Sequence, residues 1–178
     1  MNSIFKEILV FNPRVYHDKR GFFYESYSKE MEGVLQQNFA QDNHSCSNKH
    51  VIRGLHYQWN NPMGKLVRVA TGSIIDYFVD IRKASPTYGQ YDSILLNDKN
   101  RTAIWIPPGF AHGFETLEDN TIVLYKCSNY YNGLCEGGIN PFDSQINIPW
   151  YTDPAKRIVS DRDLNSQTLI RYSADPKF

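Results

Sequence analysis

Short runs of β-branched and aromatic residues, separated by Gly and Pro turn signals about every 10 to 20 residues, set the strongest limit on the fold. The stretch KLVRVATGSIIDYFVDIR, from Lys65 to Arg82, contains two apolar runs around Thr71-Gly72-Ser73 and predicts a hairpin. Further strands are expected at Tyr91 to Leu96, Thr102 to Ile106 and Thr121 to Cys127. Because no long helical pattern lies between these runs, the chain is expected to be an all-β antiparallel sandwich or barrel.

Helical signals are short. The segment from Ser28 to Gln37 predicts a helix that Gly33 weakens, and Ser160 to Asp163 has the pattern of a capping box. The irregular region from Pro141 onward is expected to wrap around the barrel. The length of 178 residues predicts a single domain, residues 1–178, large enough to bury a core without disulfides or a structural metal.

Composition excludes several classes of protein. Nineteen Lys and Arg balance nineteen Asp and Glu, so no overall field favours nucleic acid or an anionic membrane as a partner. The three cysteines have no C-x-x-C spacing, which argues against a disulfide framework or a zinc site and suits a reducing compartment. No leader pattern and no apolar run of about 18 residues occurs, so a soluble cytoplasmic protein is expected.

The most informative segment is QDNHSCSNKHVIRGLHYQ, from Gln41 to Gln58, in which a polar loop leads into a strand bearing Arg53 and His56. Strict alternation would put these two side chains on opposite faces. Gly54 lies between them, and a glycine inside a strand often marks a bulge, so both side chains are expected to reach one pocket. On local sequence alone, an ordinary hydrogen-bonded strand histidine is the competing interpretation.

Five ordered strings carry a resemblance to a known family. They are RGFFYES at 20–26, RGLHYQ at 53–58, GKLVR at 64–68, IPPGFAHGF at 106–114 and YKCSNYY at 125–131. Together they resemble the dTDP-4-dehydrorhamnose 3,5-epimerase family, in order from about Arg20 to Asp163. The resemblance implies a cupin-type antiparallel jelly-roll barrel with a few short helices, and a homodimer that pairs through its N-terminal segment.

The resemblance also implies an activity: epimerisation at C3 and C5 of a nucleotide-linked 4-keto-6-deoxyhexose, from dTDP-4-dehydro-6-deoxyglucose to dTDP-4-dehydro-L-rhamnose, for L-rhamnose or a related surface sugar. In this scheme His56 is the base, Asp163 orients it, Lys65 stabilises the enolate and Tyr125 is the acid. Removing a hydrogen α to a ketone and returning it on the other face requires a base, a cation that stabilises the enolate and an acid. Each residue also has a plain structural interpretation: Asp163 as a helix cap for Ser160, Lys65 as a solvated strand end and Tyr125 as a buried tyrosine.

The remaining matches concern substrate binding. By resemblance, Tyr131 stacks on the thymine base, and the nucleotide-sugar site is lined by Arg20, Glu25, Gln41, Arg53, His112, Glu136 and Arg162. Arg20 and Arg53 suit a diphosphate because guanidinium pairs bidentately with phosphate oxygens. Since the chain has no P-loop and no G-x-G-x-x-G, side chains are expected to hold the diphosphate.

No metal and no cofactor are expected. Metal-binding cupins use an H-x-H pair, whereas His56 is followed two residues later by Gln58. A metal-dependent cupin dioxygenase is therefore disfavoured, and a non-catalytic sugar-nucleotide-binding cupin would not need a base and an opposed phenol.

Two departures from the family leave open a mono-epimerase at C3 or C5, or an epimerase that acts on another keto sugar. The family's Trp-Asn-Asp-Pro string is replaced by INPFDS at 139–144, and Arg162 stands where lysine is usual.

Overall fold

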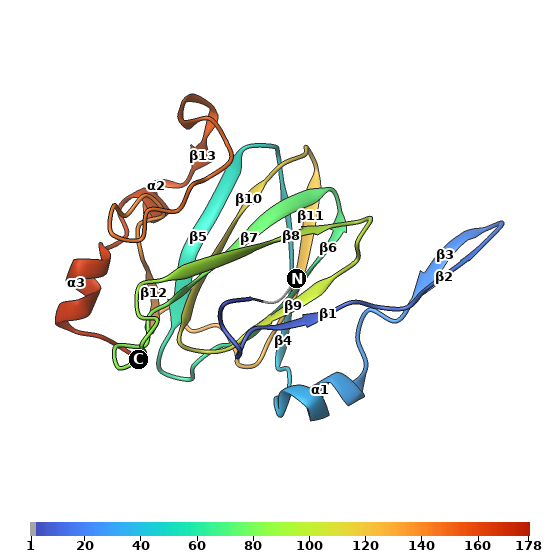
Figure 1. The fold of residues 1–178 in the computed structure, drawn as a ribbon, viewed down its shortest axis with the longest axis horizontal. Coiled ribbons are helices and arrows are strands. Elements are labelled where there is room, and N and C mark those ends of the chain that lie inside the picture. The colour runs from blue at the N-terminus through green and yellow to red at the C-terminus, as the bar shows by residue number, and fades with distance from the viewer. Residues whose placement is uncertain (1–2) are drawn as a thin grey trace.

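Two antiparallel β-sheets pack face to face at the centre of the computed structural model, which describes residues 3–178 (Figure 1). The first sheet has the order β1 (Leu9–Phe11), β9 (Ala103–Ile106), β6 (Lys65–Thr71), β11 (Thr121–Cys127) and β4 (Gln41–Ser47). The second has the order β12 (Glu136–Gly138), β5 (Val51–Gln58), β10 (Phe110–Thr116), β7 (Ser73–Asp80) and β8 (Tyr91–Asn97). Strand β13 (Ile158–Val159) pairs in parallel with β5. The predicted antiparallel jelly-roll barrel is confirmed.

A separate hairpin and a few short helices complete the structure. Strands β2 (Val15–Asp18) and β3 (Gly21–Tyr24) form a two-stranded arm that projects away from the sheets (Figure 1). The helices are α1 (Lys29–Leu35), the 3-10 turn η1 (Pro154–Lys156), α2 (Asp161–Leu164) and α3 (Leu169–Ala174). Helix α1 confirms the short helix expected in the segment from Ser28 to Gln37. None of the helices within residues 3–178 has the length and apolarity needed to cross a membrane.

The hairpin predicted around Thr71-Gly72-Ser73 is wrong. Strand β6 pairs with β9 and β11, whereas β7 pairs with β8 and β10, so the two apolar runs belong to different sheets. Gly72 turns the chain from one sheet to the other with a φ of 82°. A Cβ atom at this glycine would lie 2.4 Å from Oγ1 of Thr121. The sequence signal marked a sharp reversal correctly, but a reversal can join two sheets as readily as two neighbouring strands.

The core between the sheets is built by alternation along their strands. In β7, Ile74 and Phe78 point between the sheets, whereas Tyr77 and Val79 belong to a second cluster on the outer face. Both faces of β7 are therefore buried, which explains its near-continuous apolar sequence. The core between the sheets consists of Phe5, Ile8, Val67, Val69, Ile74, Phe78, Leu96, Ile104, Ile106, Phe110, Phe114 and Val123.

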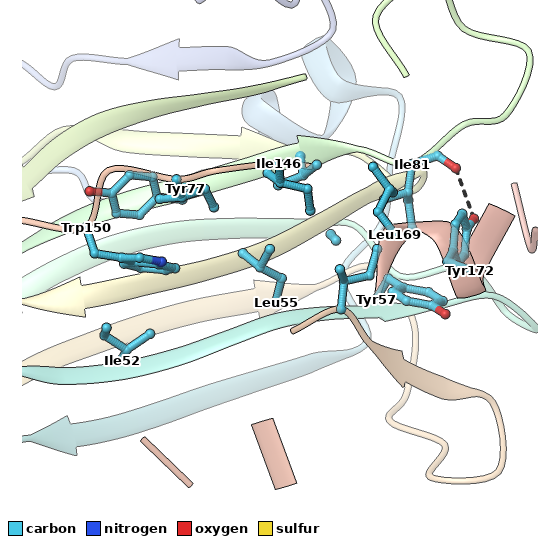
Figure 2. Close-up of a cluster of buried hydrophobic side chains, with 13 residues drawn as sticks. Ile52, Leu55, Tyr57, Tyr77, Ile81, Ile146, Trp150, Leu169 and Tyr172 are labelled. Atoms are coloured by element: carbon cyan, nitrogen blue, oxygen red, sulfur yellow. Dashed lines mark hydrogen bonds between the residues drawn. The ribbon is translucent and has the colours of Figure 1, made fainter. Parts of the chain in front are cut away.

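The C-terminal segment covers the outer face of the second sheet, as expected for the region from Pro141 onward. Figure 2 shows Trp150 and Tyr172 of this segment packed against side chains of the sheet strands and of the chain just beyond β7. The Tyr172 hydroxyl donates to the carbonyl oxygen of Ile81 at 3.0 Å. Buried Glu115 accepts hydrogen bonds from the backbone N–H groups of Tyr151 and Thr152 at 2.7 and 2.9 Å. These contacts fix the path that carries α2 to the open edge of β5.

Candidate active site

A cavity of about 510 Å³ opens between the two sheets, near the side where β13 and α2 pack against β5. The first sheet contributes Ser45, Lys65 and Tyr125 to its wall. The second sheet contributes residues from β5 and β10, and the C-terminal segment closes the remaining side. The lining residues are Ser45, Val51, Ile52, Arg53, His56, Lys65, His112, Gly113, Phe114, Tyr125, Ile158, Val159, Ser160, Arg162 and Asp163.

A β-bulge at Gly54 places Arg53 and His56 on the same face of β5. His56 lies opposite His112, and Arg53 lies opposite Phe114. The distance covered by three residues along β5 is therefore covered by two along β10, which is the pattern of a bulge. The predicted bulge is confirmed, and both side chains line the cavity. Gly54 has a φ of 127°, and a Cβ atom there would lie 2.6 Å from Cα of Gly113. Only glycine fits this close approach of the two backbones.

His56 and Asp163 form a hydrogen-bonded pair at the cavity wall. Nε2 of His56 lies 2.7 Å from Oδ1 of Asp163, and the backbone N–H of Gly54 donates to Oδ2 at 3.1 Å. The imidazole is 25% exposed, whereas the carboxylate is 5% exposed. Burial raises the pKa of Asp163, but the hydrogen bond and charge of His56 outweigh it, so the net pKa lies below its ordinary value. The carboxylate therefore stays ionised and holds the ring in one orientation.

Only half of the predicted capping box forms. Ser160 precedes α2, and its Oγ accepts a hydrogen bond from the backbone N–H of Asp163 at 3.1 Å. The side chain of Asp163 does not complete the box, because its two oxygens bind His56 and Gly54. The backbone of Asp163 thus belongs to the cap, whereas its carboxylate contacts His56 at the cavity wall.

Lys65 and Tyr125 lie on neighbouring strands of the first sheet and both line the cavity. Burial lowers the pKa of the Lys65 ammonium, while the charges of Glu136 and Asp76 act in the opposite direction. No carboxylate within residues 3–178 lies within 4.0 Å of its Nζ. Burial also raises the pKa of the Tyr125 phenol, which therefore keeps its proton at neutral pH. The cavity thus holds a lysine amino group without a direct ion pair and a protonated phenol.

His112 is also in the cavity, but it has a partner that the sequence analysis missed. Its Nε2 lies 2.9 Å and 3.0 Å from the two carboxylate oxygens of Asp76. Asp76 is fully buried in β7. One signal could have revealed it: an aspartate inside the apolar run SIIDYFVD must find a polar partner when the strand is buried.

A second group of predicted residues forms a chain of hydrogen bonds at the rim. Arg162, which lines the cavity, donates to the carboxylate of Glu136. The Tyr131 hydroxyl donates to the same carboxylate at 2.9 Å. The backbone N–H of Tyr131 donates to the side-chain oxygen of Gln41, also at 2.9 Å. Arg53 lines the cavity and donates from Nε to Oγ of Ser47 at 3.0 Å. Four of the predicted residues are therefore linked to one another by hydrogen bonds, and Arg162 and Arg53 line the cavity itself.

Arg20 and Glu25 are not part of this cavity. Arg20 lies at the turn of the projecting β2–β3 arm, is 84% exposed and forms an ion pair with Asp18 (Figure 1). Glu25 directly follows β3. The structure therefore separates these two residues from the other predicted site residues of the same chain.

The altered segment from Ile139 to Ser144 does not line the cavity either. Ile139 is buried and exchanges backbone hydrogen bonds with Leu55, and the Asn140 side chain donates to the carbonyl oxygen of Leu164 at 2.6 Å. Through Asn140, this segment contacts the end of α2. The substituted segment therefore lies outside the cavity wall of its own chain.

A metal centre has no obvious ligand set here. Across the part of the chain that the structure describes, no three side chains from His, Cys, Asp and Glu gather in a way that could hold a metal ion. The two cavity histidines are each hydrogen-bonded to a carboxylate instead. The arrangement brings together a histidine base, an ammonium group and a phenol, which are the groups needed to remove and return a proton next to a carbonyl.

Comparison with known proteins gives one consistent result. The sequence model of the dTDP-4-dehydrorhamnose 3,5-epimerase family matches residues 2–170. The Salmonella typhimurium protein of that name is 48% identical over 148 residues, covering 81% of each chain. The Shigella flexneri protein is 44% identical over 169 residues, covering 92% of each.

A solved structure agrees with the sequence relatives. The structure of dTDP-6-deoxy-D-glucose-3,5-epimerase from Legionella pneumophila, in complex with dTDP-4-keto-L-rhamnose, superposes with a TM-score of 0.91 at 41% identity. The match covers 96% of this chain and 92% of that one. On the family match, the sequence identities and the shared fold, this chain belongs to the dTDP-4-dehydrorhamnose 3,5-epimerase family.

Proposed function

We propose that this protein epimerises C3 and C5 of dTDP-4-dehydro-6-deoxyglucose and so produces dTDP-4-dehydro-L-rhamnose. The observation that carries the proposal is the His56–Asp163 pair, which shares one cavity with Lys65 and Tyr125. The names of the relatives supply the substrate, and the side chains of this cavity supply the chemistry.

Each epimerisation needs two proton transfers. His56 removes the hydrogen from the carbon next to the ketone, and the electron pair of the broken C–H bond moves to the ketone oxygen as an enolate. Asp163 stabilises the resulting imidazolium, and the Lys65 ammonium stabilises the enolate oxygen. Tyr125 then donates its hydroxyl proton to the same carbon from the opposite face, which inverts the configuration. Exchange with water restores both residues before the next step.

The rim residues suit the nucleotide. The Arg53 guanidinium faces the cavity without a carboxylate within ion-pair distance among residues 3–178, so it is available to an anionic diphosphate. Tyr131 is 56% exposed and presents an aromatic face for stacking on the base. Its hydroxyl is tied to Glu136, which fixes the orientation of the ring. We assign Gln41 and Arg162 to the same binding surface.

The projecting arm supports the proposal of a homodimer. The arm carries Arg20 and Glu25 away from the cavity of their own chain, and it exposes Phe22 and Phe23 at 56% and 70%. An exposed two-stranded arm of this kind is stabilised when it packs on another surface. We propose that each arm packs on a second copy and supplies Arg20 and Glu25 to the cavity of that copy. A cytoplasmic location is proposed with it, because the free cysteines suit a reducing compartment.

Deuterium exchange tests the activity. The protein is incubated with dTDP-4-keto-6-deoxyglucose in deuterium oxide, and the product is analysed for deuterium at each carbon. Double epimerisation predicts incorporation at both C3 and C5. Incorporation at one carbon would identify a mono-epimerase, the alternative left open by the substituted segment at 139–144. An absence of exchange would contradict the proposed function.

A further inference from the structure

The cavity contains a second histidine–aspartate pair. His112 lies directly opposite His56 across the β5–β10 ladder, so the two rings occupy adjacent positions on one face of the sheet. Asp76 holds His112 from β7, the strand on the other side of β10. The second pair is more enclosed than the first: the imidazole is 8% exposed and the carboxylate is fully buried.

The Asp76 carboxylate has a single hydrogen-bond partner within residues 3–178, and that partner is Nε2 of His112. Its neighbours on the same face of β7 are Ile74 and Phe78, which belong to the apolar core. A carboxylate buried among apolar side chains is costly, and an apolar replacement of similar volume would often stabilise such a site. Packing alone therefore does not explain an aspartate here.

The other nitrogen of the ring, Nδ1, has no protein partner within residues 3–178. Within residues 3–178, the fully buried side-chain polar atoms without a hydrogen-bond partner are Oγ of Ser45, Oη of Tyr88 and Nε of Arg101. Nδ1 of His112 is not one of them, so this unpartnered nitrogen is not fully buried. Because His112 lines the cavity, this nitrogen is accessible from it. Burial lowers the pKa of His112, and the positive charges of Lys65 and His56 act in the same direction against the attraction of Asp76. A lowered pKa favours the neutral ring, in which one nitrogen is a donor and the other is an acceptor.

We infer that Asp76 is a positioning residue that keeps the proton of His112 on Nε2, so that Nδ1 faces the cavity as an acceptor for a hydroxyl group of the hexose. This inference rests on the proposed function, because it names the part of the substrate that His112 recognises. A hydroxyl group donates to a bare ring nitrogen, whereas a phosphate or a carbonyl oxygen does not. With the tautomer set by Asp76, His112 therefore binds the sugar, while the guanidinium groups bind the diphosphate.

Two substitutions at Asp76 test the inference. Asp76→Asn keeps the volume, but its amide is able to donate to Nε2 and so shift the proton to Nδ1. Asp76→Leu removes every acceptor. Nitrogen-15 NMR of the His112 ring reports the tautomer, and calorimetry with dTDP and with dTDP-glucose, an unreactive hexose ligand, reports the binding. Asp163→Asn is the matched control, because it disturbs His56 and leaves His112 unchanged.

The expected wild-type spectrum shows Nε2 protonated and Nδ1 bare. In each variant, the affinity for dTDP-glucose and kcat/KM should fall by about 10- to 100-fold in proportion to the loss of that tautomer, the range found when hydrogen-bond partners of metal-binding histidines are removed. The affinity for dTDP should stay within about 2-fold, which is less than one neutral hydrogen bond contributes.

Each of the following results would overturn the inference: a wild-type proton on Nδ1, an equal loss of dTDP affinity, or unchanged dTDP-glucose affinity in a folded variant that has lost the tautomer. If Asp76→Leu does not fold, the tautomer and affinities of the Asp76→Asn protein alone decide the matter. A variant that keeps the wild-type tautomer and still loses sugar affinity would also overturn it. If the wild-type protein turns over no keto sugar, the proposed function fails, while the tautomer and the dTDP-glucose affinity still test the role of Asp76.

Discussion

Nε2 of His56 lies 2.7 Å from Oδ1 of Asp163, although 107 residues separate them in the chain. Two backbone contacts produce this distance: β13 pairs in parallel with the start of β5, and Gly54 donates to the other oxygen of Asp163. The pair therefore depends on how the C-terminal segment packs on the sheet as well as on its two side chains.

The first prediction concerns this pair. His56→Ala should lower deuterium exchange at both carbons by about 10² to 10⁴, the usual loss for a positioned general base. Asp163→Asn should lower it less, because the ring remains in place but loses the charge that stabilises its imidazolium. Proton NMR of the sugar in deuterium oxide measures both rates. His56→Ala protein that kept more than about a tenth of the wild-type rate would remove His56 from the role of base.

Tyr125 gives a second prediction, which separates proton removal from proton return. Tyr125→Phe keeps the ring and its packing but deletes the hydroxyl group that faces the cavity. The variant should still exchange deuterium with retention, while inverted product falls by about 10² to 10⁴. If Tyr125 is only a core residue, the change should instead cost about 1 to 3 kcal/mol of stability and leave turnover per folded molecule unaltered. The thermal midpoint and the inverted product, measured on one preparation, distinguish these results.

The sequence predicted several strands and the Gly54 bulge, because alternation and glycine placement are local properties of the chain, whereas the group around His56 came from the family resemblance. The segment from Gln41, expected to begin as a polar loop, is instead strand β4. The sequence did not predict that β6 and β7 belong to different sheets, because Gly72 supports either connection. Sheet membership depends on which distant strand offers an unpaired edge, and a single sequence does not contain that information.

Site prediction met the same limit. The resemblance selected Arg20 and Glu25 together with His56, yet only the fold shows that the projecting arm separates them from the cavity of their own chain. Asp76 was overlooked because it stands outside the matched strings and its partner, His112, is 36 residues away. A buried charge inside an apolar strand is visible in the sequence, but its partner becomes evident only from the neighbouring strand.

Asp80 gives a third prediction, on stability in acid. Its fully buried carboxylate accepts hydrogen bonds from Arg82, Ser85 and Thr87. Burial raises its pKa, but these hydrogen bonds outweigh it and lower the pKa to about 2, below the unfolded value of 3.8. The carboxylate therefore stabilises the fold above about pH 4, and about 2 kcal/mol of that stabilisation is lost as pH falls toward 2.

Asp80→Asn should remove this dependence. The variant should lose about 3 kcal/mol at pH 7, because Arg82 keeps its charge without its main partner. Between pH 4 and 2, the difference in stability between the wild-type protein and the variant should shrink. Urea unfolding at a series of pH values measures both quantities. A difference that stays constant over this range would show that Asp80 does not titrate with the predicted pKa, and Asp175→Asn, on the exposed tail, provides a control.

The last prediction tests whether one chain completes the cavity of another. Arg20→Ala changes the projecting arm and His56→Ala changes the cavity, and each variant alone should have little activity. If the arm of one copy enters the cavity of a second copy, a mixed dimer of the two variants contains one cavity with both residues intact. Refolding equal amounts together should therefore restore about a quarter of the wild-type activity, because half of the dimers are mixed and each has one complete cavity. If Arg20 served its own chain, no mixed dimer would contain a complete cavity and no activity would return. Light scattering on the same samples provides the control, since a 20.6 kDa monomer at micromolar concentration would contradict the dimer itself.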